Sequence, residues 1–423
     1  MSMETFDVMV IGAGAAGLCA AVQAGRAGAK TILVEKNGIC GGTITMSGVN
    51  YPGIFQAWGR QVIGGIGWEL VQKTLEEAGW PLPDFREFDA EHHWRNQIRI
   101  DAVLFAALAD RMLADAGVDV RFHTMLAALK EEDDDWRVTL CGKDGLYEVR
   151  AREIVDCTGD ANAVHMAGYE YRQSNPCQPA TYSVYAVGYD FEKLDVKAIR
   201  AAFEQAVARG EVKSEDVGWG EGFIGNFLYG KGGNCNHVCG INACDSAGRT
   251  RVEIAGRAAM LRIYRFLRRQ KGLENLEFIP KGGECGVRET RLIVGDETVT
   301  VDDYTSGRIF PEAVCYSFYP IDLHDAEVGL DKRNLTGGVV PTVPRGALIP
   351  RNSHRFLAAG RIISSDRLAN SALRIQATCM ATGQAAGAIA ALAAASGKDP
   401  REVEFARIRQ LLLEHGAILP PEA

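Results

Sequence analysis

The sequence has no excess of positive charge and no leader-like start. Lys and Arg together number 46 against 54 Asp and Glu, which gives a formal net charge of −8. Because charge of this sign repels phosphate backbones, we expect no nucleic-acid partner. Residues 1–7 carry Glu4 and Asp7 where a secretory signal would carry basic residues, so we expect no such signal.

The sequence also lacks a disulfide framework and a long run of Leu, Ile and Phe. Its eleven cysteines are an odd number and are scattered, unlike the closely spaced even sets of secreted proteins. We therefore expect a reducing, cytoplasmic location. The longest uncharged stretch, residues 375–397, is rich in Ala and includes Gln376 and Gln384. This composition predicts a buried helix and no membrane span.

The chain does have ample apolar residues, 47% of 423, which is enough for two or more cores. Near its start an apolar run over 6–11 leads into a glycine-rich turn, an Ala-rich helical segment and a second apolar run over 31–34 that ends at an acid. The turn reads Gly12-Ala13-Gly14-Ala15-Ala16-Gly17. This order is typical of a dinucleotide-binding strand–helix–strand unit.

Each glycine of that turn has a physical role. Gly12 permits the tight turn, Gly14 lets a pyrophosphate approach the backbone, and Gly17 lets the helix pack closely on the strand. The helix N-terminus offers N–H groups and a positive dipole to the phosphates. Glu35 follows at the distance that suits a hydrogen bond from a ribose hydroxyl.

The middle of the chain predicts more strands, and then its composition changes. We expect a helix over 101–117 and strands over 118–122, 125–130, 136–141, 146–151 and 154–157. The acid run 131–135 predicts a solvated hairpin turn. Aromatic residues, Pro176, Pro179 and many glycines follow, and they indicate an inserted domain. A capping box at Thr250 and Glu253 predicts a helix to about Lys271, with its arginines on a solvated face.

The chain returns to its opening pattern near the C-terminus. Residues 355–361 predict an apolar strand that ends at Gly360 and Arg361, and residues 376–396 predict an Ala-rich helix. The fold class is therefore α/β, with a discontinuous Rossmann-like domain over 1–168 and 346–423. An inserted α+β substrate domain is expected over 169–345.

Three segments in fixed order carry a resemblance to a known family: the N-terminal glycine turn, Thr158-Gly159-Asp160 after a strand, and Gly360-Arg361 before a glycine-bearing helix. The set resembles the FAD-binding domain of the glutathione-reductase-like flavoprotein superfamily that includes fumarate reductase and succinate dehydrogenase. It is most similar to a family of FAD-dependent oxidoreductases. Segments 41–48, 286–291 and 371–374 add to the likeness.

The resemblance implies an FAD site, residue by residue. The pyrophosphate would lie on Gly12, Gly14, Ala15, Ala16 and Gly17, and the adenosine ribose on Glu35 beside Lys36. The isoalloxazine would be lined by Gly41, Gly42, Thr43, Ser47 and Gly48, and the adenine would meet Leu126 or Ala127. Thr158, Gly159, Asp160, Gly360 and Arg361 would close over the cofactor, and the helix N-terminus at Arg374, Ile375 and Gln376 would face the flavin pyrimidine edge. Such a dipole stabilises the anionic reduced flavin.

The sequence differs from related flavoprotein families in two ways, and each difference excludes one kind of chemistry. The loop from Cys40 to Thr45 has no His to attach FAD covalently, so non-covalent FAD is expected. No second Cys follows at the spacing of disulfide reductases, and no second glycine fingerprint follows a strand. Thiol–disulfide chemistry and a built-in NAD(P)H site are therefore not expected.

The candidate catalytic residues come from the inserted domain and the C-terminal segments. His324 is the candidate acid or base, because its ordinary pKa suits proton transfer, and a structural His is the alternative. Arg288, Arg291, Arg345 and Arg374 are candidate clamps for a substrate carboxylate, with exposed ion-paired arginines as the alternative. Tyr319 is a candidate proton donor, with a core position as its alternative.

One further cluster has metal-ligand residue types. Cys235, His237, Cys239 and Cys244 lie close together in the sequence, but their spacing matches no common zinc pattern. We therefore expect no metal, and an ordinary loop or a substrate contact instead.

The predicted function is hydride transfer between FAD and a small polar substrate, with a carboxylate as a candidate group. An oxidase that passes electrons to oxygen and an electron-transfer subunit of a larger complex are the alternatives. The sequence leaves the electron acceptor unknown and a homo-oligomer open.

Overall fold

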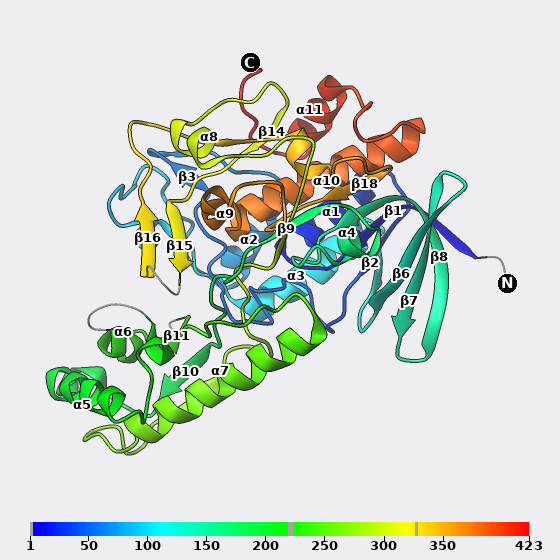
Figure 1. Ribbon diagram of the computed structural model, residues 1–423. Coiled ribbons are helices and arrows are strands. Elements are labelled where there is room, and N and C mark those ends of the chain that lie inside the picture. Colours follow the sequence, from blue (N-terminus) through cyan, green and yellow to red (C-terminus); the bar gives the residue numbers. More distant parts are fainter. Residues whose placement is uncertain (1–2, 219–222, 235, 326–328, 423) are drawn as a thin grey trace.

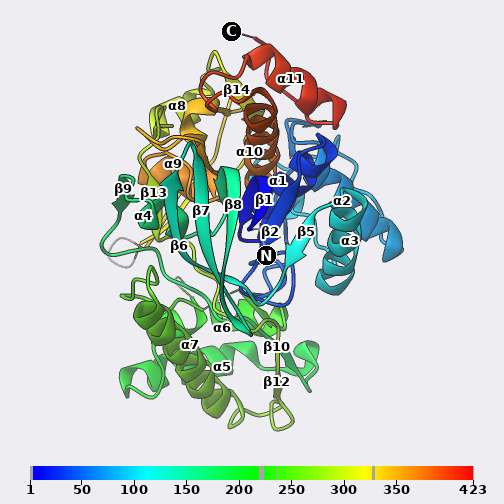
Figure 2. The ribbon, with the colours of Figure 1, turned by 90° about the vertical axis from the view of Figure 1, so that its right-hand side faces the viewer.

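The computed structural model describes residues 3–218, 223–234, 236–325 and 329–422 (Figure 1). Its main sheet has seven strands in the order β5-β2-β1-β8-β7-β6, and β18 pairs with β8. Figure 2 shows these strands side by side across the larger part of the molecule. Strands β5, β2, β1, β8 and β18 pair in parallel, whereas β6 and β7 form an antiparallel extension. The parallel part is the α/β architecture that the sequence predicts.

The elements of this larger part have the following bounds. The sheet strands are β1 (Glu4–Ile11), β2 (Thr31–Val34), β5 (Asp119–Arg121), β6 (Met125–Glu132), β7 (Asp135–Gly142), β8 (Gly145–Asp156) and β18 (Phe356–Ala358). The helices are α1 (Ala15–Arg26), α2 (Ile66–Glu77), α3 (Ala102–Asp115), α4 (Asn162–Met166), α8 (Val301–Ser306), α9 (Arg367–Leu373), α10 (Gln376–Ser396) and α11 (Phe405–Glu414). Short hairpins and pairs are made by β3 (Gln56–Ala57) with β4 (Arg60–Gln61), β9 (Tyr171–Gln173) with β13 (Arg291–Ile293), β14 (Ala313–Tyr316) with β17 (Thr342–Pro344), and β15 (Ile321–Asp325) with β16 (Gly329–Arg333).

A smaller lobe has its own apolar core. It contains β10 (Val184–Val187), β11 (Gly232–Gly233), β12 (Glu277–Pro280), α5 (Val196–Ala208), α6 (Phe223–Tyr229) and α7 (Ser246–Leu267). These elements lie together at the lower end of the molecule in Figures 1 and 2. Buried residues of the segment 299–349, by contrast, belong to the core of the larger part.

Helices α1 and α10 approach each other through small residues. A Cβ added at Gly383 would lie 2.1 Å from the carbonyl oxygen of Ala16, and one at Gly387 would lie 2.2 Å from that of Ala20. Only glycine permits so close a crossing. Within the described residues α10 alone has the length and composition of a membrane span, and 89% of its apolar window is buried inside the protein. The prediction of a buried helix over 376–396 is confirmed.

Two predicted strands are one continuous strand. The sequence suggests a break between 151 and 154 because Arg152 and Glu153 interrupt the apolar pattern, yet β8 runs unbroken through them. Glu153 is fully buried there and pairs with Arg355 (Nη1 to Oε1, 2.9 Å). The charge therefore marks an ion pair inside the protein and not a strand end.

The predicted hairpin turn is present, but it is not merely solvated. Asp133 and Asp134 adopt positive φ between β6 and β7, as a tight hairpin requires. Asp134 pairs with Arg355 (3.0 Å) and Glu131 with His354 (2.8 Å). The acidic turn thus binds the C-terminal segment.

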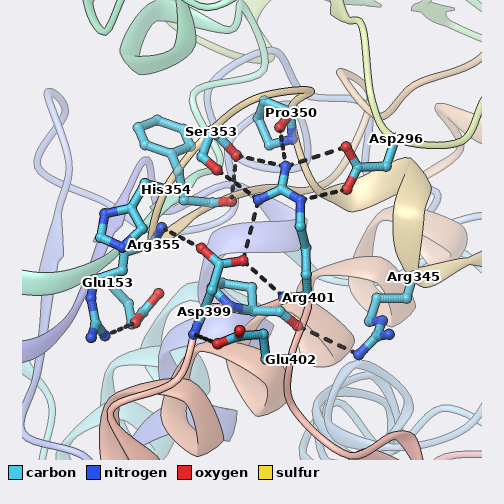
Figure 3. Close-up of polar contacts among 12 residues, drawn as sticks. Glu153, Asp296, Arg345, Pro350, Ser353, His354, Arg355, Asp399, Arg401 and Glu402 are labelled. Carbon is cyan, nitrogen blue, oxygen red and sulfur yellow. Dashed lines mark hydrogen bonds and ion pairs between the residues drawn. The ribbon is translucent and has the colours of Figure 1, made fainter.

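The C-terminal segment itself is held by an arginine network, which Figure 3 shows. Arg401 pairs with Asp296 (2.7 Å) and donates to the carbonyl oxygens of Pro350 (2.7 Å) and Ser353 (2.6 Å). These bonds tie the end of α10 to the loop before β18.

The predicted capping box of the long helix is wrong. Helix α7 begins at Ser246, and its N-cap is Asp245, five residues before Thr250; the Asp245 side chain accepts from the N–H of Gly248. Glu253 instead accepts from the N–H of Cys285 (2.8 Å). The arginines are not all solvated, because Arg262 forms two hydrogen bonds to the buried Asp216.

Candidate functional site

The main cavity lies at the edge of the sheet where the parallel strands end. Strands β1, β8 and β18 end at Ile11, Asp156 and Ala358, and the loop after each one lines a cavity of about 330 Å³. Ligands of parallel α/β sheets bind at the carboxyl ends of their strands. The N-termini of α1 and α10 reach the same cavity.

Most residues that the resemblance assigns to FAD line this cavity. They are Gly12, Gly14, Ala15, Ala16, Glu35, Lys36, Gly42, Thr43, Ser47, Gly48, Thr158, Gly159, Asp160, Gly360, Arg361, Ile375 and Gln376. Four others lie behind its wall or away from it: Gly17, Gly41, Leu126 and Ala127. Gly41 forms a bridge to Gly14, while Leu126 and Ala127 are on β6.

The glycine turn forms a cradle open to the cavity. Gly14 is the N-cap of α1 at φ −68°, and a Cβ added there would have no protein atom nearer than 4.0 Å. Gly17 is confined instead, because its Cβ would lie 1.7 Å from the carbonyl oxygen of Gly12. Gly14 therefore leaves room for a ligand, and Gly17 serves the packing of α1.

Glu35 lines the cavity close to the glycine turn. Its carboxylate accepts from the N–H groups of Ala13 (2.8 Å) and Asn37 (2.9 Å). Burial raises the pKa of Glu35, and these two hydrogen bonds partly offset the rise. Lys36 pairs with Glu284 (2.6 Å), so its ammonium group is held at the rim.

Arg361 joins three loops of the cavity wall. Its guanidinium donates to the carbonyl oxygens of Gly159 and Val287 and pairs with Asp160 (2.6 Å). Thr290 adds a hydrogen bond to Asp160 (2.9 Å). The cover that the sequence predicts from 158–160 and 360–361 is thus one hydrogen-bonded unit.

The N-terminus of α10 carries a polar side chain into the site. Gln376 donates from Nε2 to Thr43 Oγ1 (3.1 Å) and to the carbonyl oxygen of Val49 (2.9 Å). Its Oε1 is buried and has no hydrogen-bond partner among the described residues. A buried acceptor without a donor is costly, so this atom fits a ligand N–H such as that of the flavin pyrimidine. The open cradle at Gly14 and this acceptor both fit FAD.

Two arginines line the other end of the cavity: Arg288, which is buried, and Arg374, which is partly exposed. Arg288 donates to the carbonyl oxygen of Pro179 (2.7 Å), and burial and the nearby Arg374 lower its pKa to about 10. Arg374 donates to the carbonyl oxygen of Asp322 (3.1 Å) and lies 3.9 Å from the Asp322 carboxylate. Both arginines line the cavity and remain cationic at neutral pH.

Tyr319, Asp322 and His324 complete this end. Burial raises the pKa of Tyr319, so its hydroxyl stays protonated, and Gln97 donates to its oxygen (3.2 Å). Burial would raise the pKa of Asp322, but His324 and Arg374 outweigh it and hold the pKa well below its usual range. Burial and Arg288 lower the pKa of His324 to about 4 against the opposing effect of Asp322.

The structure places two of the predicted arginines outside the cavity wall. Arg291 donates to the carbonyl oxygens of Asp160 and Cys244 and to Asn162, and so braces the wall from behind. Arg345 pairs with Glu312 (2.6 Å) and donates to the carbonyl oxygen of Val403 (2.7 Å), near the arginine network of Figure 3. Neither Arg291 nor Arg345 is among the residues that line this cavity.

Sequence reasoning missed Asp322 and the role of His237. Asp322 stands two residues before His324 on β15, and this period-two spacing puts both side chains on one face of the strand. For His237 the sequence predicts an ordinary loop position or a substrate contact rather than a metal ligand. Cys235 lies outside the described residues, and among those described no group of three or more His, Cys, Asp or Glu side chains could hold a metal ion.

The comparisons with known proteins agree on FAD. The chain matches the family described as FAD dependent oxidoreductase over residues 7–412. It is 27% identical over 186 residues to a 12-dehydrotetracycline 5-monooxygenase/anhydrotetracycline 6-monooxygenase of Streptomyces rimosus, across 40% of this chain and 34% of that protein. The chain thus spans only about a third of that relative's length.

Other relatives are reductases. A probable fumarate reductase of Shewanella frigidimarina is 24% identical over 71% of this chain and 58% of its own length. The digeranylgeranylglycerophospholipid reductase 2 of Methanothermobacter thermautotrophicus is 25% identical over 73% of this chain and 75% of its own. A solved geranylgeranyl bacteriochlorophyll reductase-like protein of Thermoplasma acidophilum covers 97% of this chain and 83% of its own at a TM-score of 0.44 and 13% identity. This chain belongs to the FAD-dependent oxidoreductase family and is an FAD-dependent enzyme.

Proposed function

We propose that this enzyme transfers a hydride between FAD and a small polar substrate that carries one carboxylate. The observation that carries the proposal is the pair of guanidinium groups in the cavity wall: that of the buried Arg288 and that of Arg374, whose side chain is 11% exposed. Buried charge is stable only when it is compensated. Asp322 offsets one of the two cations, and His324 is neutral at physiological pH. One net positive charge remains, which suits a substrate monoanion.

In this proposal FAD, the two arginines and Tyr319 have different roles in the reaction. FAD supplies the hydride acceptor or donor at N5 when it is bound. Arg288 and Arg374 would bind and orient the carboxylate, because a guanidinium offers it paired N–H donors. Tyr319, protonated and held by Gln97, would donate a hydrogen bond or a proton to the reacting part of the substrate.

We further propose that FAD is bound without a covalent bond, at the cradle around Gly14 with Glu35 on the ribose. The domain division of 1–168 and 346–423 around an inserted 169–345 remains a proposal, as do the cytoplasmic location and the placement in the glutathione-reductase-like superfamily. The separate apolar core of residues 184–276 supports a distinct lobe within the proposed insertion.

An absorbance spectrum before and after acid precipitation tests the cofactor proposal. Flavin bands released into the supernatant would support non-covalent FAD, and bands that stay with the pellet would contradict it. Anaerobic titration with a panel of small carboxylic acids, each matched by its uncharged amide, then tests the substrate proposal. Bleaching of oxidised flavin, or reoxidation of reduced flavin, by the acids but not by the amides is expected.

The same experiment separates the alternatives. Peroxide formed in step with turnover in air would indicate an oxidase. Flavin that reacts with no small molecule but exchanges electrons with a protein partner would indicate an electron-transfer subunit. Equal reaction with acids and amides would contradict the carboxylate proposal.

A further inference from the structure

Two imidazoles and a carboxylate stand in line at the substrate end of the cavity. His237 Nε2 lies 3.0 Å from His324 Nδ1, and His324 Nε2 lies 3.4 Å from Asp322 Oδ2. His237 comes from the smaller-lobe segment before α7, whereas Asp322 and His324 are on β15. The line therefore connects parts of the chain that are about 90 residues apart.

The protonation of this line follows from its ends. Asp322 is ionised, because His324 and Arg374 lower its pKa despite burial, and a carboxylate can only accept. His324 is neutral at physiological pH, since its pKa is about 4, so it carries a single N–H. That N–H must be on Nε2, which faces Asp322. His324 Nδ1 is then an acceptor, and His237 Nε2–H donates to it (3.0 Å).

Backbone hydrogen bonds hold the segment that carries His237 in place. Its backbone N–H donates to the carbonyl oxygen of Glu215 (2.8 Å), and the next residue, Val238, bridges to Ala180. The two imidazole rings lie with centroids 5.0 Å apart and planes at 55°. His237 is 6% exposed. Burial and Arg288 lower its pKa to about 2, so it is neutral and keeps the one N–H that the line requires.

We propose that His237 is a positioning residue: its Nε2–H holds His324 in the tautomer that presents an N–H, and not a lone pair, beside Asp322 in the cavity wall. His324 therefore donates to the Asp322 carboxylate and does not act as the base or acid that the sequence suggests. The expected effect on carboxylate binding rests on the proposed function, but the tautomer does not depend on it.

Nitrogen NMR of the FAD-loaded enzyme with ¹⁵N-labelled histidine tests the tautomer directly. At neutral pH, both His324 and His237 are expected to show a protonated Nε2 and an unprotonated Nδ1. Spectra of His324→Gln and His237→Gln assign the two rings by the signals that disappear. A wild-type spectrum with His324 protonated on Nδ1 would overturn the proposal without any variant.

Two substitutions of His237 then separate hydrogen bonding from packing. His237→Gln keeps an N–H donor and is expected to keep the His324 tautomer, whereas His237→Leu removes the donor and is expected to give a mixture of tautomers. The affinity for acetate, read from the flavin absorbance, is expected to fall about tenfold in the Leu variant and little in the Gln variant.

The outcomes distinguish this proposal from the proposed function. An unchanged His324 tautomer in His237→Leu would overturn the positioning role. If the Leu variant does not fold, the wild-type and Gln spectra still decide the tautomer. If the tautomer is as expected but no carboxylate reacts or binds, the proposed function fails and the positioning role stands.

Discussion

A methyl group at Gly14 tests the cradle without disturbing the fold. The φ of −68° and ψ of −174° at Gly14 suit alanine, and the nearest protein atom to the added Cβ would be 4.0 Å away. The free energy of unfolding of the apoprotein is therefore expected to change by about 0.5 kcal/mol or less in Gly14→Ala. The methyl would instead occupy the space where the pyrophosphate approaches the backbone.

The expected loss of FAD affinity follows from that overlap. Forcing a methyl group into a close-packed contact costs about 1–3 kcal/mol, which corresponds to about a 5-fold to 150-fold rise in Kd. Quenching of FAD fluorescence by the apoprotein measures Kd, and thermal unfolding of the apoprotein measures stability.

Gly17→Ala is the matched comparison within the same turn. Its Cβ would lie 1.7 Å from the Gly12 carbonyl oxygen, so it is expected to lower the melting temperature even without FAD. Wild-type FAD affinity in Gly14→Ala would refute the assignment of the pyrophosphate to this cradle.

Three further predictions concern the substrate end and the core. Arg288→Gln is expected to weaken acetate binding to the holoenzyme by about tenfold or more, because a charged hydrogen bond contributes about 1.5–3 kcal/mol. Arg333→Gln, at an exposed position, is the control. Equal losses of acetate affinity in both variants would contradict the assignment of Arg288 to the substrate carboxylate. The pKa values of His237 and His324 are lowered in the folded state, so below about pH 6.5 the unfolded chain binds more protons than the folded one. The free energy of unfolding is therefore expected to fall as the pH falls, by about 1.4 kcal/mol per pH unit for each histidine. Denaturant unfolding at several pH values measures this slope, and a slope unchanged in the double His→Gln variant would count against it. Gly383→Ala is expected to destabilise the protein by about 1–3 kcal/mol by forcing α10 away from α1, and a wild-type melting temperature would show that the crossing is not tight.

The sequence predicts best what depends on the local backbone. The glycine turn, α1, β2 and the start of α10 at Gln376 follow from turn geometry and apolar periodicity, and all lie where they are expected. The capping box predicted at Thr250 is wrong because Asp245, five residues before Thr250, is a preferred N-cap residue and caps the helix instead.

The end of the cavity around Arg288, Arg374 and Asp322 depends on contacts between distant segments, which no local pattern records. Arg288, Asp322 and Arg374 come from three separate elements: the loop before β13, strand β15 and the junction of α9 with α10. They line one cavity only because these elements converge in the fold. Arg291 resembles Arg288 in its local sequence, yet it is turned to the carbonyl oxygens behind the wall. Charge in the sequence therefore identified the candidates but not the direction of each side chain.

The pairing of β8 with β18 has a consequence for how the chain is made. Glu153 is buried beside Arg355, a residue 202 positions later. At about 5–20 residues per second, a ribosome needs about 10–40 s to travel that distance. During this interval Glu153 has no Arg355 to pair with, and the edge of β8 that pairs with β18 is open. Such an edge is prone to pair with other chains until the last strand of the sheet emerges.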